Sequence, residues 1–280
     1  MPVLADGGVV KTPKYIGAKG TPDASDYILQ RLPYGESYCE PFAGMLGVLL
    51  RRRPSKFEVV NDLDGKICAW WRAIRDHPDE LKERFELTEV GRGVFDQAWE
   101  TLQNGVDKEG TVNIAWSLAV LLEQAARAYV EDTQPYWLSP KGYDDIKNIP
   151  GYNFWNIAPS IPLLHQRLKK VVIDNRDALE LLERMGKSPG AVIYCDPPYP
   201  STSDGFKNEG YECTVDFDAM LELLPTLNAR VAVSGYEECP WENLGWYKHA
   251  ETRTSMMSKS YRRECLWTNY KPDGQTTLTL

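Results

Sequence analysis

The chain has 280 residues, 42% of them hydrophobic and 26% charged, and its formal net charge is −8. A chain of this length can bury a sizeable core, as one large domain or as a domain with an insert. No apolar run is long enough to span a bilayer, and the start Met-Pro-Val-Leu-Ala-Asp is not typical of a secretory signal. We therefore expect no membrane partner.

Cysteine usage predicts a metal-free protein with reduced thiols. The six cysteines are scattered without a CxxC pair, and only three histidines accompany them. Structural zinc sites need clustered ligands, so we expect no metal, and unpaired thiols are typical of a cytoplasmic protein. The acidic net charge argues mildly against nucleic acid as a partner, although a basic face can coexist with an acidic one.

The first predicted elements have the order of a nucleotide-binding α/β sheet. Residues 37–39 predict a short strand that leads into the glycine-containing segment 40–47. Residues 45–52 are predicted to be helical, and 57–60 predict a second strand that ends at Asn61-Asp62. Strand, glycine loop, helix and strand in this order begin the doubly wound folds.

The next segments are predicted to be mostly helical. Ile67, Trp70, Trp71 and Ile74 have helical spacing and are predicted to be core residues. A helix is expected over 78–87, with proline in its first turn, and a long amphipathic helix over 112–130. Residues 132–160 are rich in Pro, Gly, Asn, Lys and aromatic residues and give no regular pattern.

Regular elements resume at Ser160, a predicted helix cap with Pro162 in the first turn. The strands and helices expected after it are strand 171–174, helix 177–185, strand 191–195, helix 217–227, strand 230–234 and a final aromatic-rich stretch over 246–270. Together they predict an α/β fold with a Rossmann-like sheet, helices on both faces and a mostly helical insert. The catalytic domain is predicted to comprise residues 1–65 and 161–280, and the insert residues 66–160.

The most informative motif is Asp196-Pro197-Pro198-Tyr199, directly after the apolar strand predicted at 191–195. Asp196 therefore lies at the carboxyl end of a strand, where open α/β sheets bind ligands. The two prolines stiffen the loop, so the Asp196 carboxylate and the Pro197 carbonyl are acceptors at a fixed spacing. They can accept the two hydrogens of an exocyclic NH2 group while the Tyr199 ring stacks on the base.

This motif resembles the catalytic motif of the amino-methyltransferases, which transfer a methyl group from S-adenosylmethionine to adenine N6. Two further features fit the resemblance. Gly44, in Glu40-Pro41-Phe42-Ala43-Gly44, follows a strand and lets the backbone approach a ligand closely. Asp62 ends the second strand, where nucleotide-binding sheets place an acid against ribose hydroxyls. Each is common alone, but their order with Asp-Pro-Pro-Tyr is specific.

Across nearly its whole length the chain is similar to the Dam-like, D12 class of DNA adenine methylases. Tyr15-Ile16-Gly17-Ala18-Lys19 matches a Trp-Ala-Gly-Gly-Lys pattern that holds the cofactor in this family. The resemblance thus implies S-adenosylmethionine as cofactor, with contacts from Tyr15, Lys19, Glu40, Phe42, Gly44, Asp62, Asp177 and Asp196. It makes Asp196, Pro197, Pro198 and Tyr199 the catalytic residues, and it identifies 263–270 with the closing strand of the family.

The chain departs from the family at two places. Met45 and Leu46 stand where the family usually has a glycine at one of the two positions, and Ala178 stands where it has an aromatic residue. The first departure bears on cofactor affinity and on the shape of the adenine pocket.

The motif order is the α arrangement, which implies that the insert recognises the target and that duplex DNA is the partner. An adenine amine is paired inside the duplex, so base flipping is also implied. Within 132–160 we expect Lys141, Asn153 and Asn156 to contact DNA, because the segment mixes cationic, amide and aromatic side chains. Packing of its aromatic residues against the sheet is the alternative.

Other functions stay open at this point. One alternative is an amino-methyltransferase for cytosine N4 or RNA, although cytosine N4 enzymes more often carry Ser in place of Asp196. A second is a catalytically degenerate module that binds DNA or cofactor. The DNA sequence that is read, a cognate restriction enzyme and the oligomeric state (a monomer or weak dimer is expected) are not determined by the sequence.

Overall fold

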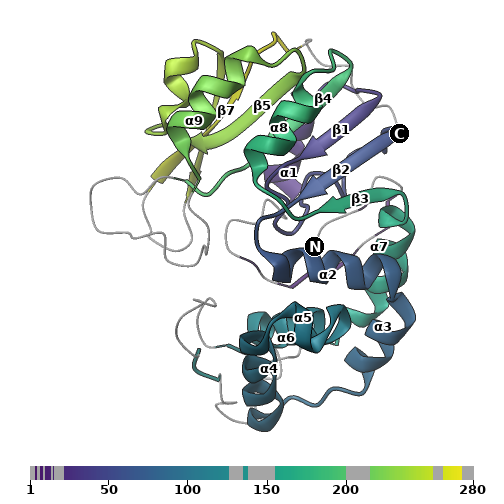
Figure 1. Cartoon of the computed structure of the whole chain (residues 1–280). Coiled ribbons are helices and arrows are strands. Elements are labelled where there is room, and N and C mark those ends of the chain that lie inside the picture. The colour runs from purple at the N-terminus through teal and green to yellow at the C-terminus, as the bar shows by residue number, and fades with distance from the viewer. Residues whose placement is uncertain are drawn as a thin grey trace.

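A mixed sheet of seven strands forms the centre of the computed structural model (Figure 1). The model describes residues 4, 7–8, 10–13, 15, 22–125, 135–137, 155–199, 215–254 and 261–272. The strands are β1 (Ser37–Glu40), β2 (Phe57–Asn61), β3 (Val171–Asp174), β4 (Ala191–Cys195), β5 (Arg230–Tyr236), β6 (Tyr247–Thr254) and β7 (Tyr261–Thr268). Their spatial order is β3-β2-β1-β4-β5-β7-β6.

The order of strands creates one switch point. Strands β3, β2, β1, β4 and β5 pair in parallel, whereas β7 is antiparallel to both β5 and β6. The chain proceeds from β1 outward to β3 in one direction and from β4 to β5 in the other. In open α/β sheets, ligands bind outside the carboxyl ends of the strands at such a reversal, here between β1 and β4. The predicted α/β class is confirmed.

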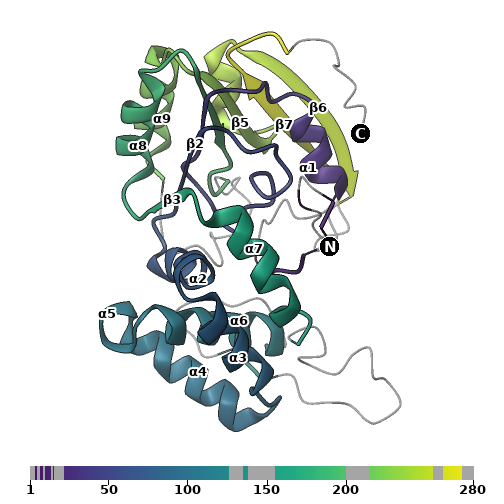
Figure 2. The same cartoon turned by 90° about the vertical axis from the view of Figure 1, so that its right-hand side faces the viewer.

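Alternate residues of the central strands enter two cores, one on each face of the sheet. In β4, Val192 and Tyr194 pack into one cluster, whereas Ala191, Ile193 and Cys195 pack into the other. This period of two is what a pleated strand covered on both faces requires. Helices α8 (Ala178–Gly186) and α9 (Phe217–Leu223) cover one face, and α1 (Pro22–Leu29) lies on the other (Figure 2).

A helical unit lies between β2 and β3 in the chain and below the β3 edge in Figure 1. It contains α2 (Gly65–Asp76), α3 (Pro78–Glu86), α4 (Arg92–Asn104), α5 (Val106–Glu109) and α6 (Thr111–Gln124), after which η2 (Ala158–Ser160) and α7 (Ile161–Leu168) lead to β3. The predicted core residues Ile67, Trp70, Trp71 and Ile74 are fully buried. They belong to the same cluster as Tyr38 and Val60 of the sheet, so the unit and this face of the sheet share a core.

The helix predicted over 45–52 is absent, and the segment forms successive turns. Leu46 takes a left-handed backbone with φ 52°, and its amide bonds back to Ala43. Two carbonyls of the segment accept side-chain donors: Gly47 from the Ser25 hydroxyl and Leu49 from Arg167. Some helical bonds remain, because the Leu50 and Arg52 amides donate to the carbonyls of Leu46 and Val48, so tertiary and local hydrogen bonds share this loop.

Other elements differ from prediction at their ends. Helix α6 stops at Gln124, because Ala125 is extended (ψ 144°) and forms a bridge with Trp137. Nearly all residues of α6 are buried, whereas an amphipathic helix would bury only one face. The helix expected over 217–227 ends at Leu223 and continues as the 3-10 turn η3 (Leu224–Thr226), which contains a proline. Ser160 precedes α7 as expected, yet its hydroxyl accepts from the Lys11 amide and does not cap the helix. Helix α1 was not predicted.

The described helices include none that is both long and apolar enough to cross a membrane. Among the same residues, no group of three or more His, Cys, Asp or Glu side chains is placed to hold a metal ion. A last 3-10 turn, η4 (Pro240–Leu244), joins β5 to β6.

Candidate active site

Four of the predicted acidic residues lie at the carboxyl edge of the parallel strands. Glu40 ends β1, Asp62 follows β2, Asp177 follows β3 by three residues, and Asp196 follows β4 directly. Parallel strands end at a common edge, so the fold gathers side chains that lie up to 156 positions apart in the sequence, from Glu40 to Asp196. The edge includes the switch point between β1 and β4.

The loop after β1 is held by the loop after β2 and by α2. The Ala43 amide donates to the Asn61 carbonyl at 2.8 Å, and the Gly44 amide donates to Asp62 Oδ2 at 2.9 Å. From α2, Trp71 Nε1 donates to the Gly44 carbonyl at 2.8 Å. Gly44 has φ 44°, and a Cβ built there would meet no atom of the described residues within 4 Å. The loop thus presents bare backbone to open space, where a ligand can approach closely.

Leu46 takes a backbone conformation that glycine usually adopts. Its φ of 52° lies in the left-handed region, which favours glycine, and it is the sole non-glycine residue with positive φ in the described part of the chain. The side chain is fully buried in the core that contains α2 and α6. Burying a leucine gains roughly 1.5–3 kcal/mol, which offsets a left-handed backbone at about 1–2 kcal/mol. The glycine-type backbone is kept without glycine.

The half-buried Asp62 carboxylate holds neighbouring backbone in place at the edge of the sheet. Oδ2 accepts from the Gly44 amide and Oδ1 from the Asp64 amide at 3.0 Å. Burial of the carboxyl raises its pKa to about 6, and hydrogen bonds from the backbone amides of Gly44, Asp64 and Leu63 oppose this shift. Each carboxylate oxygen has two lone pairs, so a carboxylate that holds three amides can still accept from a ribose hydroxyl.

Glu40 is the most deeply buried carboxyl of this edge, with 2% of its surface exposed. Its Oε1 accepts from the Tyr38 hydroxyl at 2.8 Å. The pKa of Glu40 is raised to about 8, mainly by burial and in small part by the Asp196 charge, whereas the Tyr38 hydroxyl, the Leu49 amide and Arg167 oppose the shift. Glu40 ends β1 and Asp196 directly follows β4, and these two strands are paired neighbours, so both carboxyls lie at the switch point.

The segment after β4 brings Asp196 and Tyr199 into direct contact. The Tyr199 hydroxyl donates to Asp196 Oδ1 at 2.9 Å. The Tyr199 ring packs edge-on against Tyr236 at the end of β5, with 4.6 Å between ring centroids. Burial and the Asp196 charge raise the pKa of Tyr199 well above its usual value, so the hydroxyl stays protonated as a donor. Pro197 is buried, and Pro198 is half-buried.

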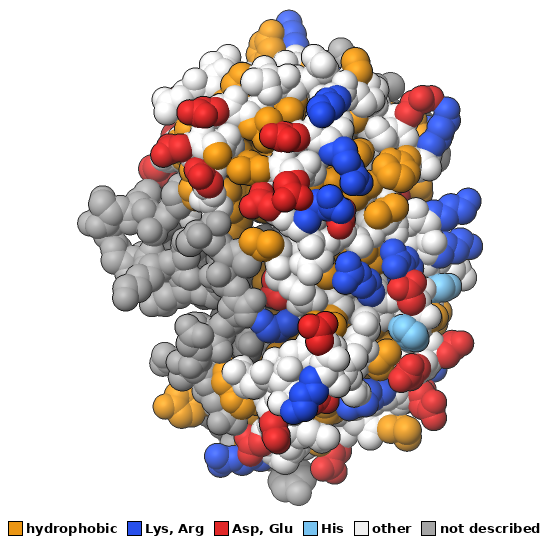
Figure 3. All heavy atoms as spheres, in the orientation of Figure 1, with side chains coloured by type: hydrophobic (Ala, Val, Ile, Leu, Met, Phe, Trp, Pro, Cys, Tyr) orange, Lys and Arg blue, Asp and Glu red, His pale blue; other side chains and the backbone are white. Residues whose placement is uncertain are grey.

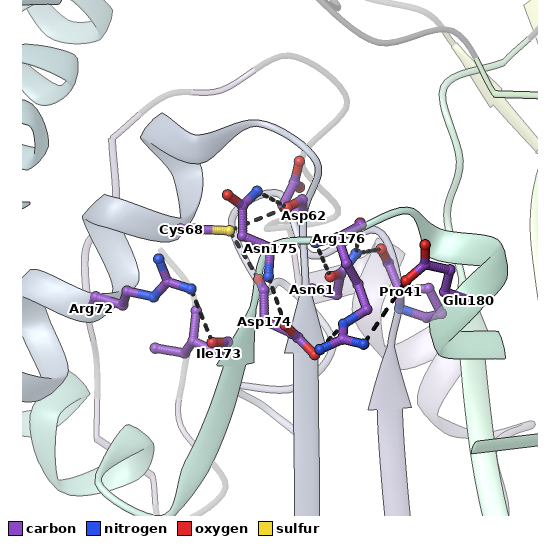
Figure 4. Close-up of polar contacts among 10 residues, drawn as sticks. All are labelled: Pro41, Asn61, Asp62, Cys68, Arg72, Ile173, Asp174, Asn175, Arg176 and Glu180. Carbon is purple, nitrogen blue, oxygen red and sulfur yellow. Dashed lines mark hydrogen bonds and ion pairs between the residues drawn. The ribbon is translucent and has the colours of Figure 1, made fainter. Parts of the chain in front are cut away.

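Two asparagines join the loops after β1, β2 and β3 (Figure 4). Asn61 is 1% exposed; its Nδ2 donates to the carbonyls of Pro41 and Arg176 at 3.0 Å each, and its Oδ1 accepts from the Arg176 amide at 3.0 Å. Asn175 Nδ2 donates to the carbonyls of Asp62 at 2.7 Å and Leu63 at 3.0 Å. The prediction from sequence assigned neither residue a role, although an amide directly before Asp62 at a strand end was a usable signal.

The remaining predicted cofactor residues lie around this edge or outside the described part. Asp177 is the N-cap of α8, and its Oδ1 accepts from the Leu179 amide at 2.7 Å. Phe42 is half-buried against the core under α8 and α9, whereas Tyr15 is half-buried against the opposite core. Lys19 lies outside the described residues.

The predicted DNA contacts fall largely outside the described residues, which include neither Lys141 nor Asn153. Asn156 is exposed in the turn before η2, and its carbonyl accepts from the Ser160 hydroxyl at 3.4 Å. On the face drawn in Figure 3, Lys and Arg side chains are interspersed with Asp and Glu, so its described part shows no uniformly basic surface.

No protein-family model matches the chain, and no curated protein matches it either.

Proposed function

We propose that the protein is an S-adenosylmethionine-dependent methyltransferase that modifies N6 of an adenine flipped out of duplex DNA. The observation that carries this proposal is the position of Asp196-Pro197-Pro198-Tyr199. The motif lies at the carboxyl end of β4, beside the switch point, with Tyr199 bonded to Asp196 and with Glu40 of β1 in the same electrostatic environment. The sheet, with an antiparallel β7 at 261–268, agrees with the Rossmann-like methyltransferase fold that the resemblance implies.

The residues present fit the cofactor. The open space beside Gly44 admits a ligand to the backbone of the β1 loop, and the Asp62 carboxylate, one loop away, can accept from ribose hydroxyls. The Asp196 carboxylate suits the positively charged sulfonium and amino groups of S-adenosylmethionine, and a bound cation would favour ionisation of the neighbouring Glu40. When bound, S-adenosylmethionine supplies an electrophilic methyl group.

The chain's own residues then bind and orient the target amine. The Asp196 carboxylate and the Pro197 carbonyl accept its two hydrogens, which directs the nitrogen lone pair toward the methyl group. The Tyr199 hydroxyl holds Asp196 at 2.9 Å, and Tyr236 supports the ring of Tyr199 from its edge. An aromatic ring beside the extruded base replaces lost stacking, which contributes about 1–3 kcal/mol per base.

A labelled-methyl transfer assay tests the proposal directly. Purified protein is incubated with methyl-labelled S-adenosylmethionine and unmethylated duplex DNA, and the nucleosides are then analysed. We expect label in N6-methyladenine. Label in N4-methylcytosine, or label in RNA alone, would assign the protein to another amino-methyltransferase class. Cofactor binding by calorimetry without transfer to any of these substrates would identify a non-catalytic binding module, and the catalytic proposal would be wrong.

A further inference from the structure

The strand-end loops that form the proposed cofactor site are joined by one buried side chain, Asn61. Its amide contacts the backbone of Pro41, 20 positions earlier, and of Arg176, 115 positions later. Pro41 begins the loop that presents Gly44, and Arg176 directly precedes Asp177. Asn61 itself precedes Asp62. The side chain therefore connects three segments that each carry a predicted cofactor-binding residue.

The side-chain amide of Asn61 uses both its N–H donors and its carbonyl acceptor in these contacts. Both N–H groups of Nδ2 are directed to carbonyls, those of Pro41 and Arg176, and Oδ1 accepts from the Arg176 amide. An amide supplies two donors and an acceptor in one plane, which no other side chain of this size does. Aspartate would retain the acceptor but would turn an oxygen toward two carbonyl oxygens. The position therefore selects asparagine chemically.

Burial makes these three contacts consequential. Asn61 is 1% exposed, so removal of its amide leaves backbone groups without a partner in a poorly solvated position. A buried polar group that loses its partner costs about 1–3 kcal/mol. Neighbouring contacts reinforce the connection: the Asn61 carbonyl accepts from the Ala43 amide, and Cys68 Sγ contacts the carbonyls of Asp62 and Asp174 (Figure 4).

We infer that Asn61 is a positioning residue for cofactor binding: it sets the distance between the Gly44 loop, Asp62 and the Asp177 segment without touching the ligand itself. The identity of the ligand rests on the proposed function, whereas the positioning of the three loops by Asn61 does not depend on it. Loops fixed before binding lose less conformational entropy when a ligand arrives, so pre-organisation raises affinity. A residue of this kind acts on cofactor affinity more than on the rate with cofactor saturating.

Asn269 offers a matched control at the opposite end of the sheet. It also uses one amide to bridge backbone groups, since Nδ2 donates to the Ala229 carbonyl at 2.8 Å and Oδ1 accepts from the Val231 amide at 2.8 Å. Those partners flank the start of β5, whereas the proposed site lies at the carboxyl ends. Asn269→Ala therefore removes a comparable structural amide away from the site.

The first measurement needs no cofactor. Hydrogen exchange of the unliganded protein should show faster exchange at residues 41–46 and 175–177 in Asn61→Ala, and unchanged exchange there in Asn269→Ala. If Asn61→Ala leaves exchange at both segments as in the parent, Asn61 does not position these loops and the inference is wrong, whatever the protein's activity.

The second measurement is the affinity for S-adenosylmethionine by calorimetry, with stability measured by urea. We expect Asn61→Ala to bind about tenfold more weakly, or about 1.4 kcal/mol, and Asn269→Ala to bind as the parent does. Equal affinity losses in both variants would reduce Asn61 to a general stabilising residue. If Asn61→Ala does not fold, Asn61→Ser keeps a polar group but cannot reach all three partners, and it should show the same pattern. A parent that binds no S-adenosylmethionine would contradict the proposed function, while the exchange result would still decide the positioning role.

Discussion

The carboxyl ends of β1 to β3 and those of β4 and β5 are built in different ways. The first group is connected by amides and carboxylates that bond to backbone: Asn61, Asp62 and Asn175 hold loops from three strands together. The second group is aromatic, with Tyr199 edge-on to Tyr236 and its hydroxyl on Asp196. Backbone-directed hydrogen bonds fix positions for a ligand with many polar groups, whereas aromatic edges and faces suit a planar one. Under the proposed function, the first group would bind the polar cofactor and the second the planar target base.

The largest effect should follow removal of the Asp196 carboxylate. Asp196→Ala eliminates an acceptor for the target amine, and a loss of methyl transfer of about a hundred- to a thousandfold is expected, comparable to loss of an oriented catalytic hydrogen-bonding group. DNA binding should persist. Asp216→Ala is the control, because Asp216 caps α9 through the Ala219 amide outside the site. Near-parental transfer by Asp196→Ala would show that the catalytic site lies elsewhere.

The ionisation of Glu40, which ends β1 next to β4, should set how stability depends on pH. Its pKa is about 8 in the folded protein and 4.5 when unperturbed, so the folded state retains a proton that the unfolded state loses as pH rises between these values. The free energy of unfolding should therefore fall from about pH 4.5 to about pH 8. Asp62, with a pKa near 6, contributes in the same direction at the lower end, which leaves pH 6–8 mainly to Glu40.

Glu40→Gln removes this proton linkage and can still accept from Tyr38. Urea titrations should show that the variant gains stability over the parent by pH 8, on the order of a few kcal/mol, and that its profile is flatter between pH 6 and 8. The control Glu36→Gln alters an exposed pair with Lys56 and should leave the slope unchanged. Parallel profiles for parent and Glu40→Gln would mean that Glu40 is ionised in the folded protein at neutral pH.

Substitution of Asp62 changes only the hydrogen-bonded loops after β1 to β3. With the net loss in Asp62→Ala taken as one charge-assisted hydrogen bond of roughly 1.5–3 kcal/mol, cofactor affinity should fall about ten- to a hundredfold by calorimetry. Asp64→Ala is the matched control: it removes the cap of α2, whose side chain accepts from the Lys66 amide at 2.8 Å, and should cost about 1 kcal/mol of stability with affinity intact. Unchanged affinity in Asp62→Ala would leave Asp62 as a brace for the Gly44 loop only.

The smallest effect is expected at Tyr199, within the aromatic group. Tyr199→Phe keeps the ring against Tyr236 and loses only the bond to Asp196 Oδ1, so methyl transfer should drop by less than about tenfold, the equivalent of one hydrogen bond. Tyr199→Ala should be more damaging, because stacking is also lost. Equal defects in the two variants would assign the role of Tyr199 to its hydroxyl and would contradict base stacking.

Local sequence patterns were sufficient to predict most strands and helices and part of the site. The runs at 171–174 and 191–195 form strands with the predicted bounds: 191–195 is buried on both faces and apolar throughout, whereas 171–174 is the edge strand β3, with Val172 exposed. Pro78 begins α3 as expected, since a first-turn proline lacks only an amide that has no helical partner. The positions of Glu40, Asp62 and Asp196 at strand ends followed from the strands themselves.

Only the tertiary structure decided how the loops between these elements are held. Residues 45–52 have helical propensity, yet Ser25 and Arg167 bond to their carbonyls and Leu46 is buried with a left-handed backbone. Asn61 becomes a connector solely because parallel pairing puts the loops after β1 and β3 on either side of β2. The sequence by itself determined most of the strands and helices, since these depend on periodicity and on proline and glycine, but it determined neither α1 nor the turns at 45–52. The joining of distant loops depends on strand order, which no local pattern encodes.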